Sequence, residues 1–122
     1  MDNADFKKQL IQRSYLFSLE VMKLIDGLNK RDFSQEILAK QLLRSATSIG
    51  ANIVEAQAGS SRRDFANFLN HALKSANETK YWLGLLRDGD MVERQKAEKL
   101  LQEVSELANI LGSSVRSARA KK

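Results

Sequence analysis

Apolar residues recur at intervals of three and four along almost the whole chain, which is the spacing of one face of an α-helix. Four such stripes are separated by short polar breaks, and each stripe is about seven helical turns long. We therefore predict four helices, over about residues 3–28, 33–58, 62–87 and 91–118. Their inward-facing residues are expected to be Phe6, Leu10, Phe17, Val21, Leu24 and Leu28; Leu38, Leu42, Ala46, Ile49, Ile53 and Ala56; Phe65, Leu69, Ala72, Ala76, Leu83 and Leu86; and Ala97, Leu100 or Leu101, Val104, Leu107, Leu111, Val115 and Ala118.

Each of the three breaks carries a helix start signal, which is an acidic or hydroxyl residue followed three positions later by Gln, Asp or Glu. In this capping-box spacing each side chain can accept a hydrogen bond from a backbone N–H that the first turn leaves unpaired. The pairs predict where the second, third and fourth helices begin. They are Asp32 with Gln35, Ser61 with Asp64, and Asp90 with Glu93.

Short connections between long helices make consecutive helices run antiparallel. The predicted fold class is therefore all-α, an antiparallel up-down-up-down four-helix bundle. A chain of 122 residues with 43% apolar residues and no proline suits a single domain with one core, covering residues 1–122.

Composition excludes several classes of protein. The chain has no cysteine, which excludes disulfides, thiolate metal sites and cysteine nucleophiles and is compatible with a reducing cytoplasm. The start of the chain, residues 1–5, lacks the basic and then apolar layout of a secretory signal. The longest uncharged stretch, Ser45–Val54, is about half of the ~20 residues that a membrane-spanning helix requires. We expect a soluble, cytoplasmic protein without a membrane partner.

The residues that commonly carry chemistry are missing or isolated. The one histidine, His71, is in no Glu-x-x-His pair, which a di-iron bundle would require, and is expected on the surface or at a helix interface. Neither a glycine-rich phosphate loop nor a Gly-x-Ser-x-Gly nucleophile turn is present. We therefore predict no catalytic residue, no cofactor and no metal. The alternative of an enzyme that uses Glu55 or Glu78 stays open.

Polar residues form a second stripe on the predicted second helix, beside its apolar one. The stripe consists of Arg44, Ser48, Asn52 and Glu55, at steps of four, four and three. Candidate partners on the third helix are Glu78, Tyr81 and Trp82. Arg44 would join Glu55 or Glu78 in a partly buried network that fixes helix register or a subunit contact. A solvated polar face and a ligand site are the alternatives.

The net charge of +5 is concentrated near the end of the chain. Met1–Ala108 carries sixteen basic and fifteen acidic residues, whereas Asn109–Lys122 carries four basic residues and no acidic one. We therefore predict a basic C-terminal tail over residues 116–122.

The predicted topology brings the chain start, the turn between the second and third helices and the C-terminus to one end of the bundle. That end would carry eight basic residues against Asp2, Asp5 and Asp64. A cationic end suits phosphate backbones, because lysine and arginine bound to phosphates release counterions. The alternative is that basic termini aid solubility and complement a helix dipole. The candidate nucleic-acid-binding residues are Lys7, Lys8, Arg62, Arg63, Arg116, Arg119, Lys121 and Lys122.

Three segments of the chain are similar to those of a known family. They are Gln41–Ala56, Ser61–Phe65 and Ala72–Leu83, and Ser14–Leu19 agrees as well. Over about residues 14–86 the chain resembles the four-helix bundle proteins known as 23S rRNA intervening-sequence proteins. The fourth helix and the tail agree only in general character.

The resemblance implies a bundle without established enzymatic activity, encoded within insertions in bacterial large-subunit ribosomal RNA genes or elsewhere in genomes. A related group forms basic homopentamers that bind nucleic acid and the reverse transcriptase of diversity-generating retroelements. By this resemblance a ring of five subunits is expected. The family-typical positions would be Arg44, Ser48, Asn52, Glu55, Glu78 and Tyr81.

Two hypotheses about function follow. The first is a non-enzymatic homo-oligomer whose cationic end contacts RNA or DNA phosphates without reading bases. The alternative is a scaffold or accessory subunit that binds a partner protein, for example a reverse transcriptase, without touching nucleic acid.

Overall fold

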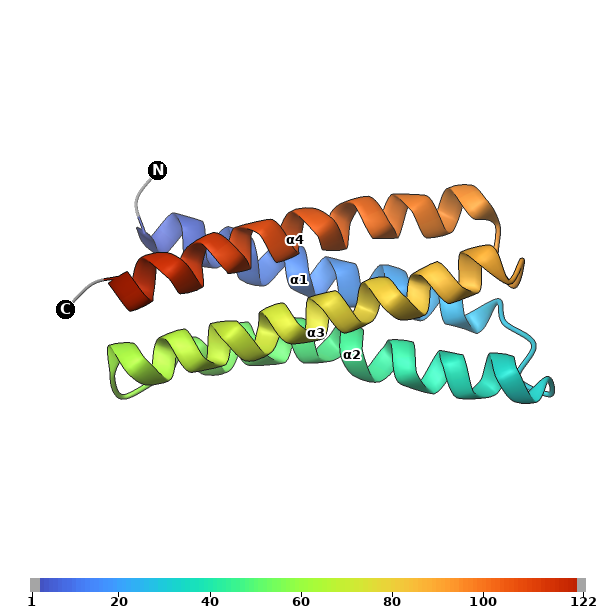
Figure 1. The fold of residues 1–122 in the computed structure, drawn as a ribbon, viewed down its shortest axis with the longest axis horizontal. Coiled ribbons are helices and arrows are strands. Elements are labelled where there is room, and N and C mark those ends of the chain that lie inside the picture. Colours follow the sequence, from blue (N-terminus) through green and yellow to red (C-terminus); the bar gives the residue numbers. More distant parts are fainter. Residues whose placement is uncertain (1–2, 121–122) are drawn as a thin grey trace.

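Four helices run alternately up and down in the computed structural model, which describes residues 3–120 (Figure 1). Their bounds are Asn3–Asp26 for α1, Phe33–Gln57 for α2, Arg62–Asp88 for α3 and Arg94–Ala120 for α4. The predicted all-α four-helix bundle is confirmed, and no strand occurs in the described part of the chain.

The four helices do not pack equally tightly. α3 lies along both α2 and α4, α1 packs mainly on α2, and of the neighbouring pairs α1 and α4 approach each other least. Side chains therefore fill three of the four seams between neighbouring helices. The fourth seam, between α1 and α4, is more open.

Most of the predicted inward-facing residues are buried in a single core. Phe6 is the exception, with 39% of its surface exposed. It lies in the first turn of α1, and the first buried layer of this helix forms one turn later at Leu10. Four others are only half-buried: Leu38, Phe65, Leu101 and Ala118.

The core also buries three hydroxyl residues that the apolar stripes did not include, Ser14, Ser45 and Thr79. Their small size lets neighbouring helices approach closely. Ser14 on α1 faces Gly50 on α2, where an added Cβ would lie 3.0 Å from the Ser14 hydroxyl oxygen. Small residues on α2 therefore set how near α1 can come.

The first two predicted capping boxes are confirmed at their N-cap residues. The Asp32 carboxylate accepts a hydrogen bond from the Gln35 N–H at 3.3 Å, and Ser61 Oγ accepts one from the Asp64 N–H at 3.1 Å. The Gln35 side chain differs from a regular box, since its Oε1 accepts from the Asn29 N–H at 2.9 Å. It thereby holds the α1–α2 loop against the start of α2.

The prediction of a third capping box was wrong. Asp90 belongs to the C-terminal cap that follows α3 and does not begin α4. Its φ of 57° lies in the left-handed region. The Asp90 N–H donates to the Arg87 carbonyl at 3.1 Å and the Met91 N–H donates to the Leu86 carbonyl at 3.0 Å, which is the Schellman pattern of a helix C-terminus. α4 starts at Arg94, three residues later than predicted.

Candidate functional site

The start of α1, the α2–α3 turn and the end of α4 meet at one end of the bundle (Figure 1). We call the basic residues there the cationic end. All of its members are exposed, and three acidic residues of the described chain, Asp5, Glu55 and Asp64, lie at the same end. Its members are Lys7, Lys8, Arg62, Arg63, Arg116 and Arg119. The predicted Lys121 and Lys122 lie outside the described residues.

Contacts fix part of the cationic end in place. The Lys7 ammonium lies 5.2 Å from the centre of the Phe65 ring, so α1 and α3 are joined there by a cation–π contact. Arg116 and Arg119 belong to α4, which continues to Ala120, so the predicted tail is helical up to that residue. These two guanidinium groups are therefore presented by a regular helix.

The basic residues could bind phosphates or could simply complement the helix dipoles, and their positions in the helices distinguish these two roles. A cation near a helix C-terminus is stabilising, and one in the first turn is destabilising. Arg119 lies in the last turn of α4, where the dipole favours it, whereas Arg62 and Arg63 lie in the first turn of α3, where the dipole opposes them. Helix stabilisation thus accounts for Arg119 but not for Arg62 and Arg63.

Most basic residues at the opposite end of the bundle are engaged with local partners, although Arg31 there has no carboxylate partner among residues 3–120. Lys30 donates to three carbonyls at the end of α1, at 3.1 to 3.3 Å. Arg87 Nε is 2.9 Å from Asp88 Oδ1, and this hydrogen bond lowers the pKa of the Asp88 carboxyl. Arg94 pairs with Glu98 at 3.2 Å. By contrast, Lys8, Arg63, Arg116 and Arg119 have no carboxylate partner among residues 3–120.

The predicted polar network between α2 and α3 is present, and it uses Glu78. Arg44 Nη2 donates to Gln41 Oε1 at 2.8 Å and forms an ion pair with the Glu78 carboxylate. Trp82 Nε1 donates to the same carboxylate at 2.9 Å. The Arg44 side chain is 57% exposed and that of Glu78 is 36% exposed, so this cluster lies at the edge of the α2–α3 seam.

Hydroxyl and amide groups continue the seam. Asn52 Nδ2 donates to the Ser48 carbonyl at 2.8 Å, and Ser48 Oγ lies 3.0 Å from Ser75 Oγ on α3. One helical turn away, the buried Thr79 and Ser45 hydroxyls are 2.9 Å apart. Sequence reasoning missed Ser45, Ser75 and Thr79, although Ser75 and Thr79 are four residues apart and so lie on one face of α3.

Two of the six predicted network residues lie outside it. Glu55 is exposed on α2, away from the Arg44–Glu78 pair, because it sits three turns further along the helix. Tyr81 is 61% exposed, and its ring meets the edge of the Trp82 ring with centroids 5.2 Å apart. The stripe is therefore a helix–helix contact with an aromatic rim.

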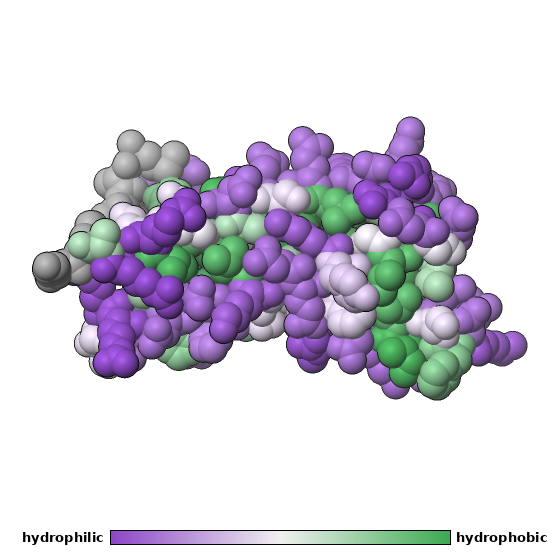
Figure 2. Space-filling model, in the orientation of Figure 1, coloured by the Kyte–Doolittle hydropathy of each residue, from purple (hydrophilic) through white to green (hydrophobic). Residues whose placement is uncertain are grey.

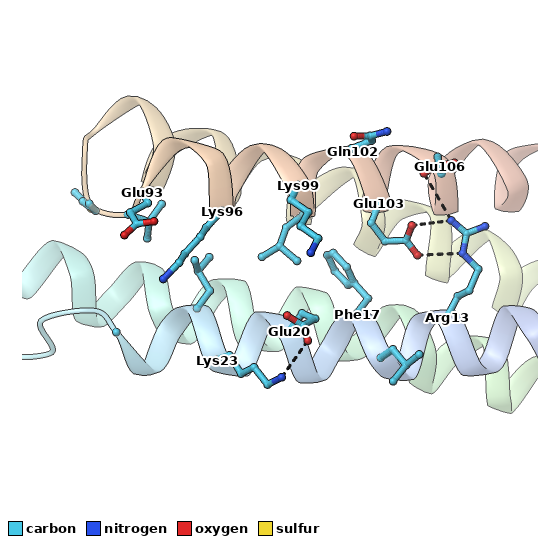
Figure 3. A pocket seen from close by; sticks show the side chains of 16 residues that line it. Arg13, Phe17, Glu20, Lys23, Glu93, Lys96, Lys99, Gln102, Glu103 and Glu106 are labelled. Carbon is cyan, nitrogen blue, oxygen red and sulfur yellow. Dashed lines mark hydrogen bonds and ion pairs between the residues drawn. The ribbon is translucent and has the colours of Figure 1, made fainter.

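A groove of about 920 Å³ follows the open seam between α1 and α4 (Figure 3). Buried Phe17, Leu24 and Leu100 contribute to its apolar lining. Arg13 bridges α1 to Glu103 of α4 with two hydrogen bonds, of 3.0 and 2.7 Å, and this pairing raises the pKa of Arg13. Sequence reasoning missed the groove because apolar spacing along each helix does not show how closely two helices approach each other.

Several other chemical roles find no support in the described chain. No three or more His, Cys, Asp or Glu side chains within residues 3–120 come close enough together to hold a metal ion. His71 is exposed, as predicted, with its ring 6.5 Å from that of Phe68. Across the same residues, no helix combines the length and the apolar character needed to cross a membrane.

Comparison with known proteins decides the family. The model of the 23S rRNA-intervening sequence protein family matches residues 7–113. The chain belongs to this family. It is also similar to a crystal structure of a protein of unknown function from the S23 ribosomal protein family of Bacteroides thetaiotaomicron, with 40% identity and a TM-score of 0.80 over 87% of this chain and 97% of that one. No curated protein matches it.

The 23S rRNA-intervening sequence protein match can be placed on the structure. It includes the whole α2–α3 seam and four residues of the cationic end, Lys7, Lys8, Arg62 and Arg63. It stops before Arg116 and Arg119. Arg62 and Arg63, whose charges are disfavoured by the dipole of α3, thus lie within the matched region.

Proposed function

We propose that this member of the 23S rRNA-intervening sequence protein family is a non-enzymatic protein that binds nucleic acid as a homo-oligomer. The cationic end contacts RNA or DNA phosphates and reads no bases. Since the proposed ligands are nucleic acids, the proposal places the protein in the cytoplasm.

One observation carries the proposal. Three separate segments of the chain bring six exposed basic residues to one end of the bundle, against the three acidic residues Asp5, Glu55 and Asp64, a described balance of +3 (six minus three). Two of the six, Arg62 and Arg63, oppose the dipole of α3. A phosphate bound at that end would offset this repulsion and release counterions as well.

Self-association is proposed from the resemblance to the basic homopentamers that accompany reverse transcriptases. A ring of five copies would carry five cationic ends. Linking several weak phosphate-binding surfaces strengthens binding through high effective concentration, without any new kind of contact. The six basic residues of each copy would then be sufficient for stable binding.

The test is binding of a fluorescently labelled structured RNA, followed by anisotropy at increasing salt. The double variant Arg63→Gln/Arg116→Gln should weaken binding and lower the slope of log K against log salt by about 2 for each copy that contacts the RNA, since each lost phosphate contact removes roughly one unit. The matched control is Arg31→Gln/Arg94→Gln at the opposite end, which also removes two positive charges. Absence of binding at low salt, or equal loss in both variants, would refute the proposal.

A second function is supported by an apolar patch at the end of the bundle opposite the cationic end, where α2 begins and α3 ends (Figure 2). Phe33 is 79% exposed there, with Ile37 and Leu85 at 40% and 39%. Clustered exposed apolar residues commonly mark protein contacts, so the protein would act as a scaffold or accessory subunit, for example to a reverse transcriptase. A partner recovered equally with and without nuclease treatment, and lost in Phe33→Ser/Leu85→Ser, would favour this function.

A further inference from the structure

From the outer face of α1 and α2, which lies behind α3 and α4 in Figure 1, we infer a docking surface for a second copy of this chain. The two copies lie antiparallel and are related by a two-fold axis. The inference rests on the proposed self-association and names a surface that carries it. Large apolar residues are exposed there: Tyr15 at 66%, Leu19 at 39%, Met22 at 45% and Val54 at 52%. We call this surface the outer belt, and its residues are Tyr15, Leu19 and Met22 of α1 and Thr47, Ala51 and Val54 of α2.

On α1 the outer belt belongs to one straight stripe whose members follow at steps of three and four residues. Arg13 pairs with α4 and Ser14 faces α2, so Tyr15, the next residue around the helix, points away from α4. The stripe is charged only at its two ends, and these charges have opposite signs. Its members are Lys8, Ile11, Tyr15, Leu19, Met22 and Asp26.

α2 continues the outer belt with a surface that carries no charge. Ser14 faces Gly50, so three residues further along each antiparallel helix Thr47 lies level with Phe17. This level is also the midpoint between Lys8 and Asp26. Side by side, α1 and α2 present a face of about 36 Å by 20 Å, or roughly 700 Å² per copy, since α1 has 24 residues. A stable interface of standard size buries about 800 Å² per partner.

Most charges that border the outer belt are already engaged. The ion pairs are Lys23 with Glu20 at 3.2 Å, Lys40 with Glu36 at 3.4 Å, and Arg44 with Glu78. Asp5, one turn before Lys8, is engaged elsewhere. Glu55 shares the stripe of Arg44, which turns toward α3. By contrast, Lys8 and Asp26 have no oppositely charged partner among residues 3–120.

The two free charges select both the occupant and its direction. A two-fold axis at the level of Phe17, perpendicular to the bundle and within the contact plane, lays each helix antiparallel on its equivalent. Lys8 then lies opposite Asp26 of the second copy, and the pair occurs twice by symmetry. Tyr15 meets Leu19 of that copy, and Thr47 lies beside its own equivalent. A parallel pair would set Lys8 against Lys8 and Asp26 against Asp26, which is repulsive.

This contact uses the same surface on both copies, so it joins copies two at a time. A ring of five requires a different kind of contact, head to tail, between two unlike surfaces. The outer belt would join two such rings face to face if they form. Every assembly that uses the outer belt throughout therefore contains an even number of copies.

Cysteine cross-linking tests the direction of the pair, and the absence of cysteine from the chain makes it unambiguous. With a short bifunctional maleimide, Thr47→Cys should link two copies. Lys8→Cys alone should not, because its two equivalents are eighteen residues, or about 27 Å, apart along the contact. A mixture of Lys8→Cys and Asp26→Cys should link. Self-linking of Lys8→Cys, or no link in the mixture, would overturn the inference.

Variants followed by light scattering test the contact itself. Lys8→Glu or Asp26→Lys should each weaken association about tenfold, because two ion pairs per contact become repulsive. The double reversal Lys8→Glu/Asp26→Lys should restore association to within about twofold of the parent. Leu19→Glu should separate the copies. Its matched control is Leu16→Glu, 50% exposed on the same helix but lining the α1–α4 groove, which should associate like the parent.

Three results would overturn the inference: an odd number of copies in the parent at about 100 µM, since interfaces of this size bind in the micromolar range or tighter; equal effects of Leu16→Glu and Leu19→Glu; or no rescue by the double reversal. A monomeric parent would also refute the proposed self-association, whereas five copies would refute the antiparallel pair alone. Binding of RNA is measured separately with Arg63→Gln/Arg116→Gln, so phosphate binding at the cationic end stands or falls independently.

Discussion

Trp82 donates its indole N–H to the Glu78 carboxylate, one helical turn before it on α3, at 2.9 Å. The same carboxylate receives the guanidinium of Arg44 from α2. Glu78 is therefore the acceptor through which an aromatic side chain of one helix and a cation of the next are held in register. Because Trp82 is the only tryptophan of the chain, its fluorescence reports directly on this contact.

The first prediction concerns this shared acceptor. Glu78→Ala should lower the free energy of unfolding by about 1 kcal/mol, because it removes a charged hydrogen bond at a partly exposed position. Glu78→Gln keeps an acceptor for Trp82 and should cost about half as much. Urea denaturation followed by Trp82 fluorescence measures both. Glu55→Ala is the control, and an equal loss there would contradict the assignment of the network to Glu78.

The buried hydroxyls of the α2–α3 seam should be energetically coupled. Thr79→Val and Ser45→Ala should each lower the free energy of unfolding by about 1 kcal/mol, since each removes one partner of a buried hydrogen bond. The double variant should lose less than the sum, by about 0.5 kcal/mol. A double-mutant cycle in urea, with exposed Ser113→Ala as the control, measures the coupling. Strict additivity would mean that the two hydroxyls do not interact.

The fold followed from the sequence because apolar periodicity over about seven turns per helix admits few other arrangements. The candidate site could be predicted from the sequence only in part. Spacing placed Arg44 and Glu78 on neighbouring helices. It also placed Glu55 on the same stripe of α2 as Arg44, but three helical turns, about 16 Å of rise, separate these two residues and exclude a direct pair. The buried hydroxyl of Ser14 was missed for a related reason, since polar residues at core positions interrupt the very pattern that identifies the core.

The loop between α3 and α4 shows how one local signal can have two meanings. Gly89-Asp90 resembles a glycine stop followed by an N-cap, yet Asp90 takes the left-handed conformation that glycine usually supplies. The hydrogen bonds from Asp90 and Met91 back to the end of α3 are main-chain features. The side-chain pattern alone therefore did not reveal them.

This loop supplies a pair of predictions with opposite signs. Asp90→Gly should raise the free energy of unfolding by about 0.5–1 kcal/mol, because glycine adopts the positive φ without a Cβ penalty. Gly89→Ala should lower it, because the new Cβ would lie 2.9 Å from the Leu85 carbonyl oxygen. Thermal unfolding by circular dichroism compares them. A stabilising Gly89→Ala would contradict the description of this loop.

Two mid-helix glycines provide the last prediction. Gly50 of α2 lies against α1, where an added Cβ would meet Ser14 Oγ at 3.0 Å and Ser14 Cβ at 3.4 Å, whereas Gly84 of α3 has no atom within 4 Å of such a Cβ. Gly50→Ala should therefore lower the free energy of unfolding by about 1–2 kcal/mol through overpacking. Gly84→Ala should raise it by about 0.5–1 kcal/mol through helix propensity.

A second-site change identifies the cause of the Gly50→Ala loss. Adding Ser14→Ala removes the hydroxyl that the new methyl group meets, and should restore at least half of the lost stability. Within residues 3–120 the Ser14 hydroxyl bonds only to the Ile11 carbonyl of its own helix, at 2.9 Å, so its removal alone should cost little. If Gly50→Ala were as stable as Gly84→Ala, the close approach of α1 to α2 would not be a constraint on this fold.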